Sequence, residues 1–319
     1  MAEQETGGSG TNWERQTIEK VALAAIQEQR RARHWGIFFK LLIFIYLFAL
    51  LFIGMGWFGK KDGGSGRHTA LVEVRGVIAP DSAASADAIN TGLQEAFKDK
   101  RTQGMVLRIN SPGGSPVQAG YINDEIKRLR TKYPDIPLYA VVEDICASGG
   151  YYVAVAADKI YVDKASIVGS IGVLMDGFGF TGTMDKLGVE RRLLTAGKNK
   201  AFLDPFSPVV ETHKDFAEQM LTQIHQQFVD VVRAGRGKRL KETPDMFSGL
   251  LWVGQASIEL GLADELGSVD YVAREVIKAE DIVDFTPREN VAERLAKKLG
   301  TGMGESLSRL GVLGGMQIR

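Results

Sequence analysis

The sequence predicts an α/β domain built on a mostly parallel sheet, preceded by one N-terminal transmembrane helix. Strand-like and helix-like segments alternate from residue 69 to about residue 280, a pattern typical of a parallel sheet covered by helices. Residues 41–58 form an apolar run without a charge. At a rise of 1.5 Å per residue this run would span about 27 Å, close to the hydrocarbon thickness of a bilayer.

The residues around the apolar run favour an uncleaved anchor over a cleaved signal peptide. Trp35 and Trp57 stand near its ends, where indole rings prefer the membrane interface, and Lys40 can extend toward the headgroups. No cleavage site of small residues follows the run. We therefore expect a tail at residues 1–34, an anchor at 35–58 and a Gly/Ser linker at 59–68.

The basic residues beside the anchor predict its orientation. Four precede the span and three follow it, namely Arg30, Arg31, Arg33 and Lys40 against Lys60, Lys61 and Arg67. The positive-inside rule then favours a cytoplasmic N-terminus, with the main domain on the exported side of an inner (plasma) membrane.

The main domain is expected at residues 69–285, with its elements in regular alternation. Strands are expected at residues 71–78, 104–110, 138–142, 159–162, 171–174 and 189–194. Helices are expected at residues 84–97, 116–130, 148–157, 208–232, 256–260 and 269–278, with a polar helix at 13–31 before the anchor. A basic tail at 286–319 follows, with a helix at 290–299. An apolar stripe on the longest helix predicts core or subunit contact; it comprises Ala217, Met220, Leu221, Ile224, Phe228 and Val231.

Composition argues against several classes of function. Lys plus Arg equals Asp plus Glu, 39 each, so the formal net charge is zero and no nucleic-acid partner is expected. Cys146 is the single cysteine, so no intramolecular disulfide can form, and we expect it to be packed. No HExxH motif and no paired-cysteine spacing occurs, so neither a metal nor a cofactor is expected.

Two glycine-rich turns follow predicted strands. In Ser111-Pro112-Gly113-Gly114 the paired glycines could direct a backbone N–H into a cleft, as in an oxyanion hole, or could form a tight turn. In Ala147-Ser148-Gly149-Gly150-Tyr151-Tyr152 the serine could be a nucleophile at a helix start, or simply a helix cap. Ser111 and Ser115 are weaker candidates for a nucleophile because each adjoins a proline.

A serine nucleophile needs a base, and the histidines are poor candidates. His34 and His68 flank the anchor, while His213 and His225 lie on the long helix, where we expect partly exposed side chains. Lysine is the remaining choice, and it acts as a base only in an apolar setting. Lys200 precedes Ala201-Phe202-Leu203, which could supply that setting; Lys198 is its competitor, and either could be a solvated loop charge.

Taken together, these motifs resemble those of the signal peptide peptidase A family. They are Ala147-Ser148-Gly149-Gly150-Tyr151-Tyr152, Ser111-Pro112-Gly113-Gly114, Gly197-x-x-Lys200-x-x-x-Asp204-Pro205-Phe206, Gly169-Ser170-Ile171-Gly172-Val173 and Gly261-Leu262-Ala263-Asp264-Glu265-Leu266-Gly267. The family consists of membrane-anchored serine peptidases with the Clp protease/crotonase-type fold. The resemblance covers about residues 70–280 and extends to the preceding anchor.

The resemblance implies a role for each matching residue. It implies a Ser148 nucleophile, a Lys200 base that keeps the spacing to Asp204-Pro205-Phe206, and a Ser170 that orients the lysine. Backbone N–H groups of Gly114 and Gly149 match the oxyanion hole, with Gly113 and Gly150 in the supporting turns. The chain has one such domain, so the resemblance also implies a homo-oligomeric ring in which subunits complete each other's sites. The implied substrates are remnant signal peptides and similar apolar peptides in or near the membrane.

Two other functions fit the same fold. A crotonase-like acyl-CoA enzyme would use backbone oxyanion donors without a nucleophilic serine, and a catalytically inert membrane scaffold would need neither serine nor lysine. The intact serine–lysine set disfavours both. A peptidase that cuts the tails of folded membrane proteins would carry the same residues as one that degrades signal-peptide remnants.

Overall fold

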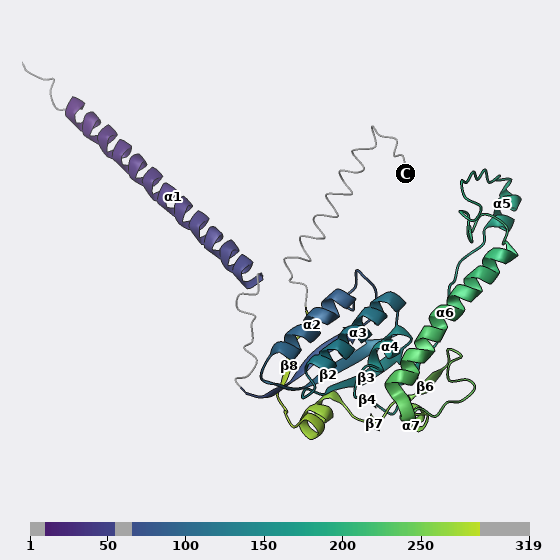
Figure 1. The fold of residues 1–319 in the computed structure, drawn as a ribbon. Coiled ribbons are helices and arrows are strands. Elements are labelled where there is room, and N and C mark those ends of the chain that lie inside the picture. Colours follow the sequence, from purple (N-terminus) through teal and green to yellow (C-terminus); the bar gives the residue numbers. More distant parts are fainter. Residues whose placement is uncertain (1–9, 55–65, 288–319) are drawn as a thin grey trace, which may run out of the picture. The chain divides into compact units, whose positions relative to one another are not determined.

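The computed structural model describes residues 10–54 and 66–287, and the chain divides into two compact units (Figure 1). The first contains helix α1 (Gly10–Gly54), which is continuous over 45 residues, about 67 Å. Within it, Arg15–Phe52 holds a stretch with a mean hydropathy of 2.3, long and apolar enough to cross a membrane. The predicted helix at 13–31 is therefore not separate from the anchor. Residues 55–58 of the expected anchor and most of the expected linker lie outside the described residues.

The second unit, Gly63–Arg288, is built on one sheet whose centre is parallel, which confirms the predicted α/β fold. Strands β1 (His68–Arg75), β2 (Thr102–Ser111) and β3 (Leu138–Ala147) form that centre. The strand order is β6-β5-β3-β2-β1-β8, and β4 pairs with both β3 and β7. The remaining strands are β4 (Lys159–Val162), β5 (Ile167–Gly169), β6 (Leu251–Val253), β7 (Glu265–Leu266) and β8 (Ile282–Asp284). Of these, only β4 was predicted.

Helices α2 (Ala86–Lys98), α3 (Pro116–Lys132) and α4 (Gly149–Ala154) cover one face of the sheet (Figure 1). Serine side chains accept hydrogen bonds from backbone amides at the starts of α2 and α3, where these amides lack partners within the helix. Both helices turn apolar side chains toward the sheet, so the main core lies between these two layers. All three helices fall close to their predicted ranges.

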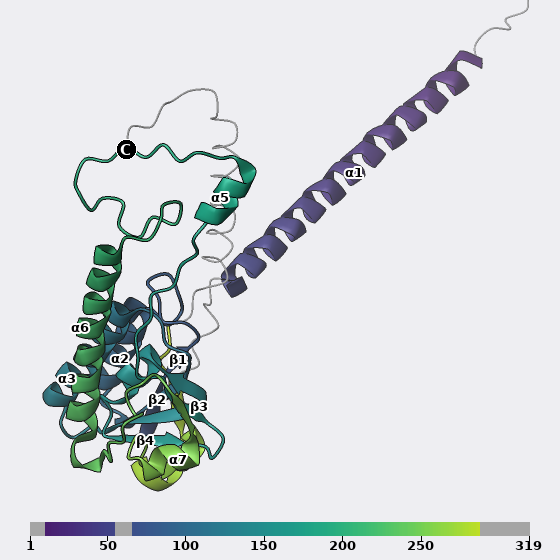
Figure 2. The ribbon, with the colours of Figure 1, turned by 90° about the vertical axis from the view of Figure 1, so that its right-hand side faces the viewer.

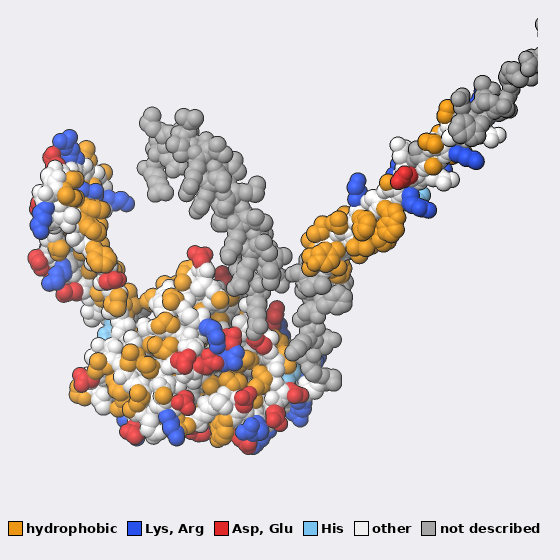
Figure 3. All heavy atoms as spheres, turned by 180° about the vertical axis from the view of Figure 1, so that it is seen from behind, with side chains coloured by type: hydrophobic (Ala, Val, Ile, Leu, Met, Phe, Trp, Pro, Cys, Tyr) orange, Lys and Arg blue, Asp and Glu red, His pale blue; other side chains and the backbone are white. Residues whose placement is uncertain are grey.

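The opposite face of the sheet carries charged side chains among apolar ones (Figure 3). Glu143 on β3 pairs with Arg75 on β1 at 2.9 Å, and Arg108 on β2 pairs with Glu73. Arg108 Nε also lies 3.7 Å from Glu143, so the acidic end of β3, where the strand signal of the sequence fades, faces a cation on the neighbouring strand β2. Acidic side chains fit a strand when they lie on a solvent-facing side with opposite charges on neighbouring strands.

Between β5 and helix α6 (Glu211–Arg236) the chain leaves the sheet and forms an arm, residues 174–210, which contains α5 (Thr181–Leu187). The arm lies at the N-terminal end of α6 (Figures 1 and 2), where Phe202 contacts His213 and Phe216. The strands predicted at 171–174 and 189–194 are wrong, because these described segments pair with no other strand. Leu174 and Leu194 are exposed to 80% and 96%, whereas Ile171 is buried in the core.

After α6 the chain returns to the sheet through short elements. They are η1 (Gly237–Arg239), α7 (Gly254–Glu259), α8 (Val269–Tyr271) and the π-helical turn η2 (Val272–Ile277). The predicted helices at 256–260 and 269–278 correspond to α7 and to α8 with η2. The helix predicted at 290–299 lies outside the described residues.

Candidate active site

Ser148 lies at the junction between β3 and α4, in a backbone conformation that is rare for a residue with a side chain. Its φ is 50° and its ψ is −121°, outside the regions that L-residues normally occupy. Its amide donates to the Gly169 carbonyl at 2.8 Å, and its carbonyl accepts from Tyr152 N at 2.9 Å. The surrounding hydrogen bonds therefore hold the half-buried serine in a strained position of the kind that occurs at functional sites.

The Gly113-Gly114 turn lies against Ser148. Both glycines have positive φ, 101° and 146°. The Ile78 amide donates to the Gly113 carbonyl and the Ser115 amide donates to the Ile78 carbonyl, each at 2.8 Å. A β-carbon at Gly114 would lie 2.1 Å from the Ile78 oxygen, so no other residue fits without a shift of the backbone.

The backbone amides of Gly114 and Gly149 form a pair of hydrogen-bond donors beside Ser148. A β-carbon on Gly149 would lie 3.3 Å from Gly114 N, so the two glycines are neighbours. Among the described residues, neither amide donates to a backbone carbonyl. Gly150 also packs against the first glycine-rich turn, because a β-carbon there would lie 3.0 Å from the Ser111 carbonyl oxygen. The two unused donors beside Ser148 are available to a developing negative charge.

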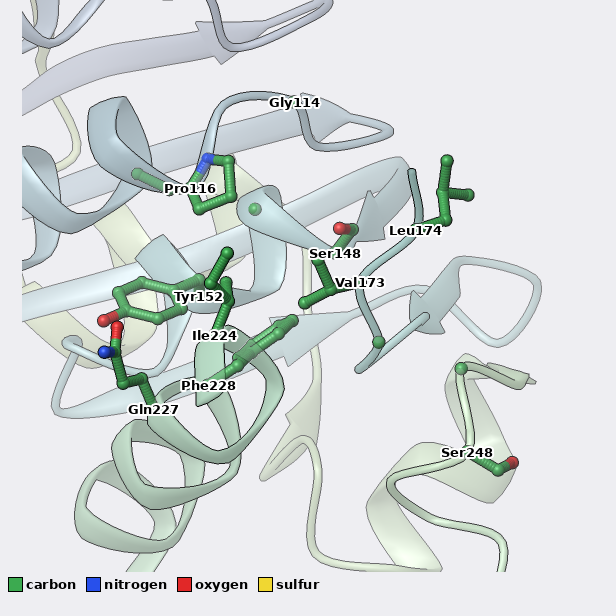
Figure 4. A pocket seen from close by; sticks show the side chains of 14 residues that line it. Gly114, Pro116, Ser148, Tyr152, Val173, Leu174, Ile224, Gln227, Phe228 and Ser248 are labelled. Carbon is green, nitrogen blue, oxygen red and sulfur yellow. The ribbon is translucent and has the colours of Figure 1, made fainter. Parts of the chain in front are cut away.

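Ser148 opens into a cavity of about 520 Å³ (Figure 4). Tyr152 and Phe228 lie on its walls with their ring centroids 5.2 Å apart. The lining residues are Gly114, Pro116, Ala119, Ser148, Gly149, Tyr152, Gly172, Val173, Leu174, Ile224, Gln227, Phe228, Ser248 and Gly249. The lining is mainly apolar, which suits an apolar peptide side chain next to the serine.

Ser170 lies at the end of the strand beside Ser148. Strands β3 and β5 are parallel, with Ala147 paired to Gly169, so the two serines are the next residues on neighbouring strands. Ser170 also has a positive φ, 51°, and its amide donates to the Leu250 carbonyl at 2.7 Å. Both predicted serines thus leave the sheet at the same edge.

In the single chain, Lys200 does not lie beside Ser148 and Ser170 at the cavity. It belongs to the arm, is exposed, and does not line the cavity. Its competitor Lys198 is exposed as well. The Asp204 carboxylate accepts from Ser207 Oγ at 2.6 Å and pairs with Arg191 at 3.1 Å. This part of the motif therefore holds the arm loop together.

The two weaker candidates for a nucleophile and the single cysteine have roles in the structure of the fold. Ser111 Oγ is held from both sides, since it donates to the Gly76 carbonyl at 2.6 Å and accepts from Gly113 N at 3.1 Å. Ser115 caps α3. Cys146 is fully buried, as predicted, and burial raises the pKa of its thiol. Over residues 10–54 and 66–287, no three His, Cys, Asp or Glu side chains gather where they could hold a metal ion.

Sequence reasoning missed the contribution of α6 to the cavity. Ile224 and Phe228 belong to the stripe assigned to core or subunit contact, and Gln227 was not considered. Helical spacing identifies which side chains share a face but not whether that face meets a core or a cavity. The predicted half-exposed state of His213 and His225 is confirmed.

Comparison with known proteins gives matches over the same region. The model of peptidase family S49 matches residues 130–283. A protein of Methanocaldococcus jannaschii is 32% identical over 225 residues, covering 67% of this chain and 71% of that protein. The chloroplastic serine protease SPPA of Arabidopsis thaliana is 28% identical over 212 residues, 66% of this chain and 30% of that protein.

Another relative is more similar in sequence, but this chain matches a smaller part of it. The Na(+)/H(+) antiporter NhaA of Brucella abortus is 44% identical over 177 residues, 56% of this chain. The chain spans only 24% of that relative's length. Most of that relative therefore lies outside the matched region, and its name is not evidence for the function of this chain.

Proposed function

The chain belongs to peptidase family S49, and from this premise we propose that it is a membrane-anchored serine endopeptidase with Ser148 as its nucleophile. One observation carries the proposal. Ser148 stands in a strained conformation at the mouth of an apolar cavity, beside the unused amides of Gly114 and Gly149. A nucleophile, an oxyanion site and a substrate pocket are the parts that acyl transfer requires.

The proposed reaction has two stages. Ser148 Oγ attacks the peptide carbonyl, its proton passes to the Lys200 amine, and the Gly114 and Gly149 amides stabilise the oxyanion. Collapse of the intermediate breaks the C–N bond, and the lysine returns the proton to the leaving amine. Water, deprotonated by the same lysine, then hydrolyses the acyl-enzyme and regenerates Ser148. Ser170 would orient the lysine.

We propose that Lys200 serves the Ser148 of a neighbouring subunit in a homo-oligomeric ring. A lysine acts as a base only when it is desolvated, but Lys200 is exposed in the single chain and does not line its own Ser148 cavity. The arm that carries it also exposes many apolar side chains. Contact between subunits would cover these side chains and desolvate the lysine at the same time.

The proposed substrates are remnant signal peptides and similar apolar peptides. The mainly apolar lining of the cavity supports this choice, and α1 would hold the enzyme where such peptides lie. With the N-terminus in the cytoplasm, the catalytic domain would act on the exported side of the inner (plasma) membrane.

The test uses detergent-solubilised full-length protein and an apolar reporter peptide. Ser148→Ala and Lys200→Ala should each abolish hydrolysis, whereas Lys198→Ala, the matched control on the same loop, should retain it. Co-expression of the two inactive variants with different tags, followed by purification on both tags, should restore part of the activity if subunits share sites. Unchanged hydrolysis in Ser148→Ala would refute a serine peptidase, and absence of rescue would refute the shared site.

A further inference from the structure

His225 connects α6 to one wall of the Ser148 cavity. It is half-buried and follows Ile224, which lines the cavity. Its Nε2 lies 3.2 Å from the Ile171 carbonyl oxygen. A carbonyl only accepts, so Nε2 carries the proton and donates. Both the Nε2-protonated neutral ring and the imidazolium supply that donor, so the contact needs no particular charge on the ring.

We propose that His225 is a positioning residue that fixes the segment 170–174, and through it Ser170 and the cavity wall. This inference rests on the function proposed for the Ser148 site. The segment matters because Ser170 begins it, while Gly172, Val173 and Leu174 line the cavity after it. Its shape therefore determines both the direction of the Ser170 side chain and the space available to a substrate.

The Ile171 side chain is fully buried in the main core, but the backbone of the segment makes few other hydrogen bonds. Ser170 N donates to the Leu250 carbonyl at 2.7 Å, and Gly172 N donates back to the Ser170 carbonyl at 2.9 Å. In the described part of the chain, the His225 bond is the one hydrogen bond that reaches residues 171–174 from another element. A β-carbon at Gly172 would lie 3.1 Å from Gly249 Cα, in the loop before β6. The segment is therefore held by His225 on α6 and contacted by this loop.

The bond also bears on the strain at Ser170. A residue with a side chain keeps a positive φ, here 51°, only when its surroundings determine it from both sides. The Leu250 carbonyl holds Ser170 from its N-terminal side. The His225–Ile171 bond holds the Ile171–Gly172 peptide, whose N–H donates to the Ser170 carbonyl at 2.9 Å. Loss of that bond would free the Ile171–Gly172 peptide and the tight turn that its N–H closes on the Ser170 carbonyl, so Ser170 would no longer present one geometry to the lysine.

Two substitutions of His225 separate this role from simple packing. His225→Leu keeps an apolar body but removes the donor, whereas His225→Gln keeps an N–H at similar reach. Gln226→Leu is the matched control, because Gln226 is the next residue on α6 and is exposed, and its side chain bonds, among the described residues, only to Asp230 one turn away. Each full-length variant would be assayed for kcat and KM on the reporter peptide and for amide hydrogen exchange in residues 170–175.

We expect His225→Leu to lower kcat about tenfold or more with a smaller change in KM, since a misplaced catalytic group weakens the transition state most. Exchange in residues 170–175 should accelerate in the same variant. His225→Gln should restore both readouts to near wild type, and Gln226→Leu should alter neither. Wild-type exchange and kcat in His225→Leu, or equal losses in the Leu and Gln variants, would overturn the proposal. If the wild type hydrolyses nothing, the proposed peptidase fails, and the exchange data alone decide whether His225 fixes the segment.

Discussion

Gly113 lies directly against Ser148, since a β-carbon built on the glycine would stand 2.7 Å from the serine Cβ and 2.7 Å from Gly149 N. The Gly113-Gly114 turn and Ser148, the proposed nucleophile, are therefore packed backbone to side chain with no space between them. This contact fixes the distance between the serine and the proposed oxyanion donors, so Gly113 matters for geometry as well as for its φ of 101°.

Substitution of Gly113 should therefore remove activity. Gly113→Ala should lower hydrolysis by about a hundredfold or more, the scale of losing an oxyanion donor, because the new methyl must displace Ser148 or the turn. Gly120→Ala is the control: Gly120 lies on α3 with nothing within 4 Å of its added methyl, so it should keep activity and leave stability unchanged or raised by about 0.5–1 kcal/mol. Peptide hydrolysis and thermal unfolding check both variants, and an active Gly113→Ala would contradict the assignment of the turn.

Labelling by a serine-directed fluorophosphonate should map to Ser148 alone. Ser111 Oγ is buried and hydrogen-bonded on both sides, and Ser115 caps α3. Ser148→Ala should therefore abolish the label. Ser115→Ala should keep it and lose about 1 kcal/mol of unfolding free energy, the usual contribution of a serine cap. Mass spectrometry locates the label, and modification of Ser115 in the wild type would show that the nucleophile has been misassigned.

The elements that the sequence predicted well are those whose pattern reflects local packing. Helix α3 follows a serine cap and a proline in its first turn, and α2 turns one apolar face to the sheet. The failures share a physical cause. Residues 171–174 and 189–194 are rich in apolar and branched residues, but strand formation needs a partner strand. No strand in the described part of the chain pairs with either segment, so both stay irregular; Leu174 and Leu194 are exposed, while Ile171 packs into the core.

The site was predictable where a motif fixes backbone geometry. The turn at Gly113 and Gly114 and the junction at Ser148 all have positive φ, which glycine-rich sequence signals directly. Side chains supplied by a distant helix carry no such signal. Ile224 and Phe228 on α6 share the helical spacing of core residues, so only the tertiary fold reveals that they line the cavity.

Acid should remove the stabilising effect of Asp99. The side-chain hydrogen bond from Arg101 lowers the pKa of Asp99 from 3.8 to about 2. A depressed carboxyl pKa stabilises the fold above the unfolded pKa and loses that effect as the pH falls through the folded one. Asp99→Asn should therefore melt below the wild type at pH 6, with the gap closing between about pH 4 and pH 2. Asp81→Asn, at an exposed carboxyl, is the control; a constant gap for Asp99→Asn would contradict the ion-pair origin.

The buried pair of Arg236 and Asp264 should matter far more than an exposed pair on the same helix. Arg236 is 1% exposed, and its two terminal nitrogens lie 2.8 and 2.9 Å from the carboxylate. Its Nε donates to the Gly261 carbonyl at 2.7 Å. Removing Arg236 leaves the buried Gly261 carbonyl without that donor and leaves Arg239, at 3.2 Å, as the remaining cation beside the Asp264 carboxylate, so Arg236→Met should lose about 3 kcal/mol of unfolding free energy. Arg233 pairs with Glu242 at 2.7 Å, but both side chains are more than 40% exposed, so Arg233→Met should lose less than about 1 kcal/mol. Denaturant unfolding in detergent measures both losses, and equal values would mean that the burial of Arg236 does not govern the strength of its pair.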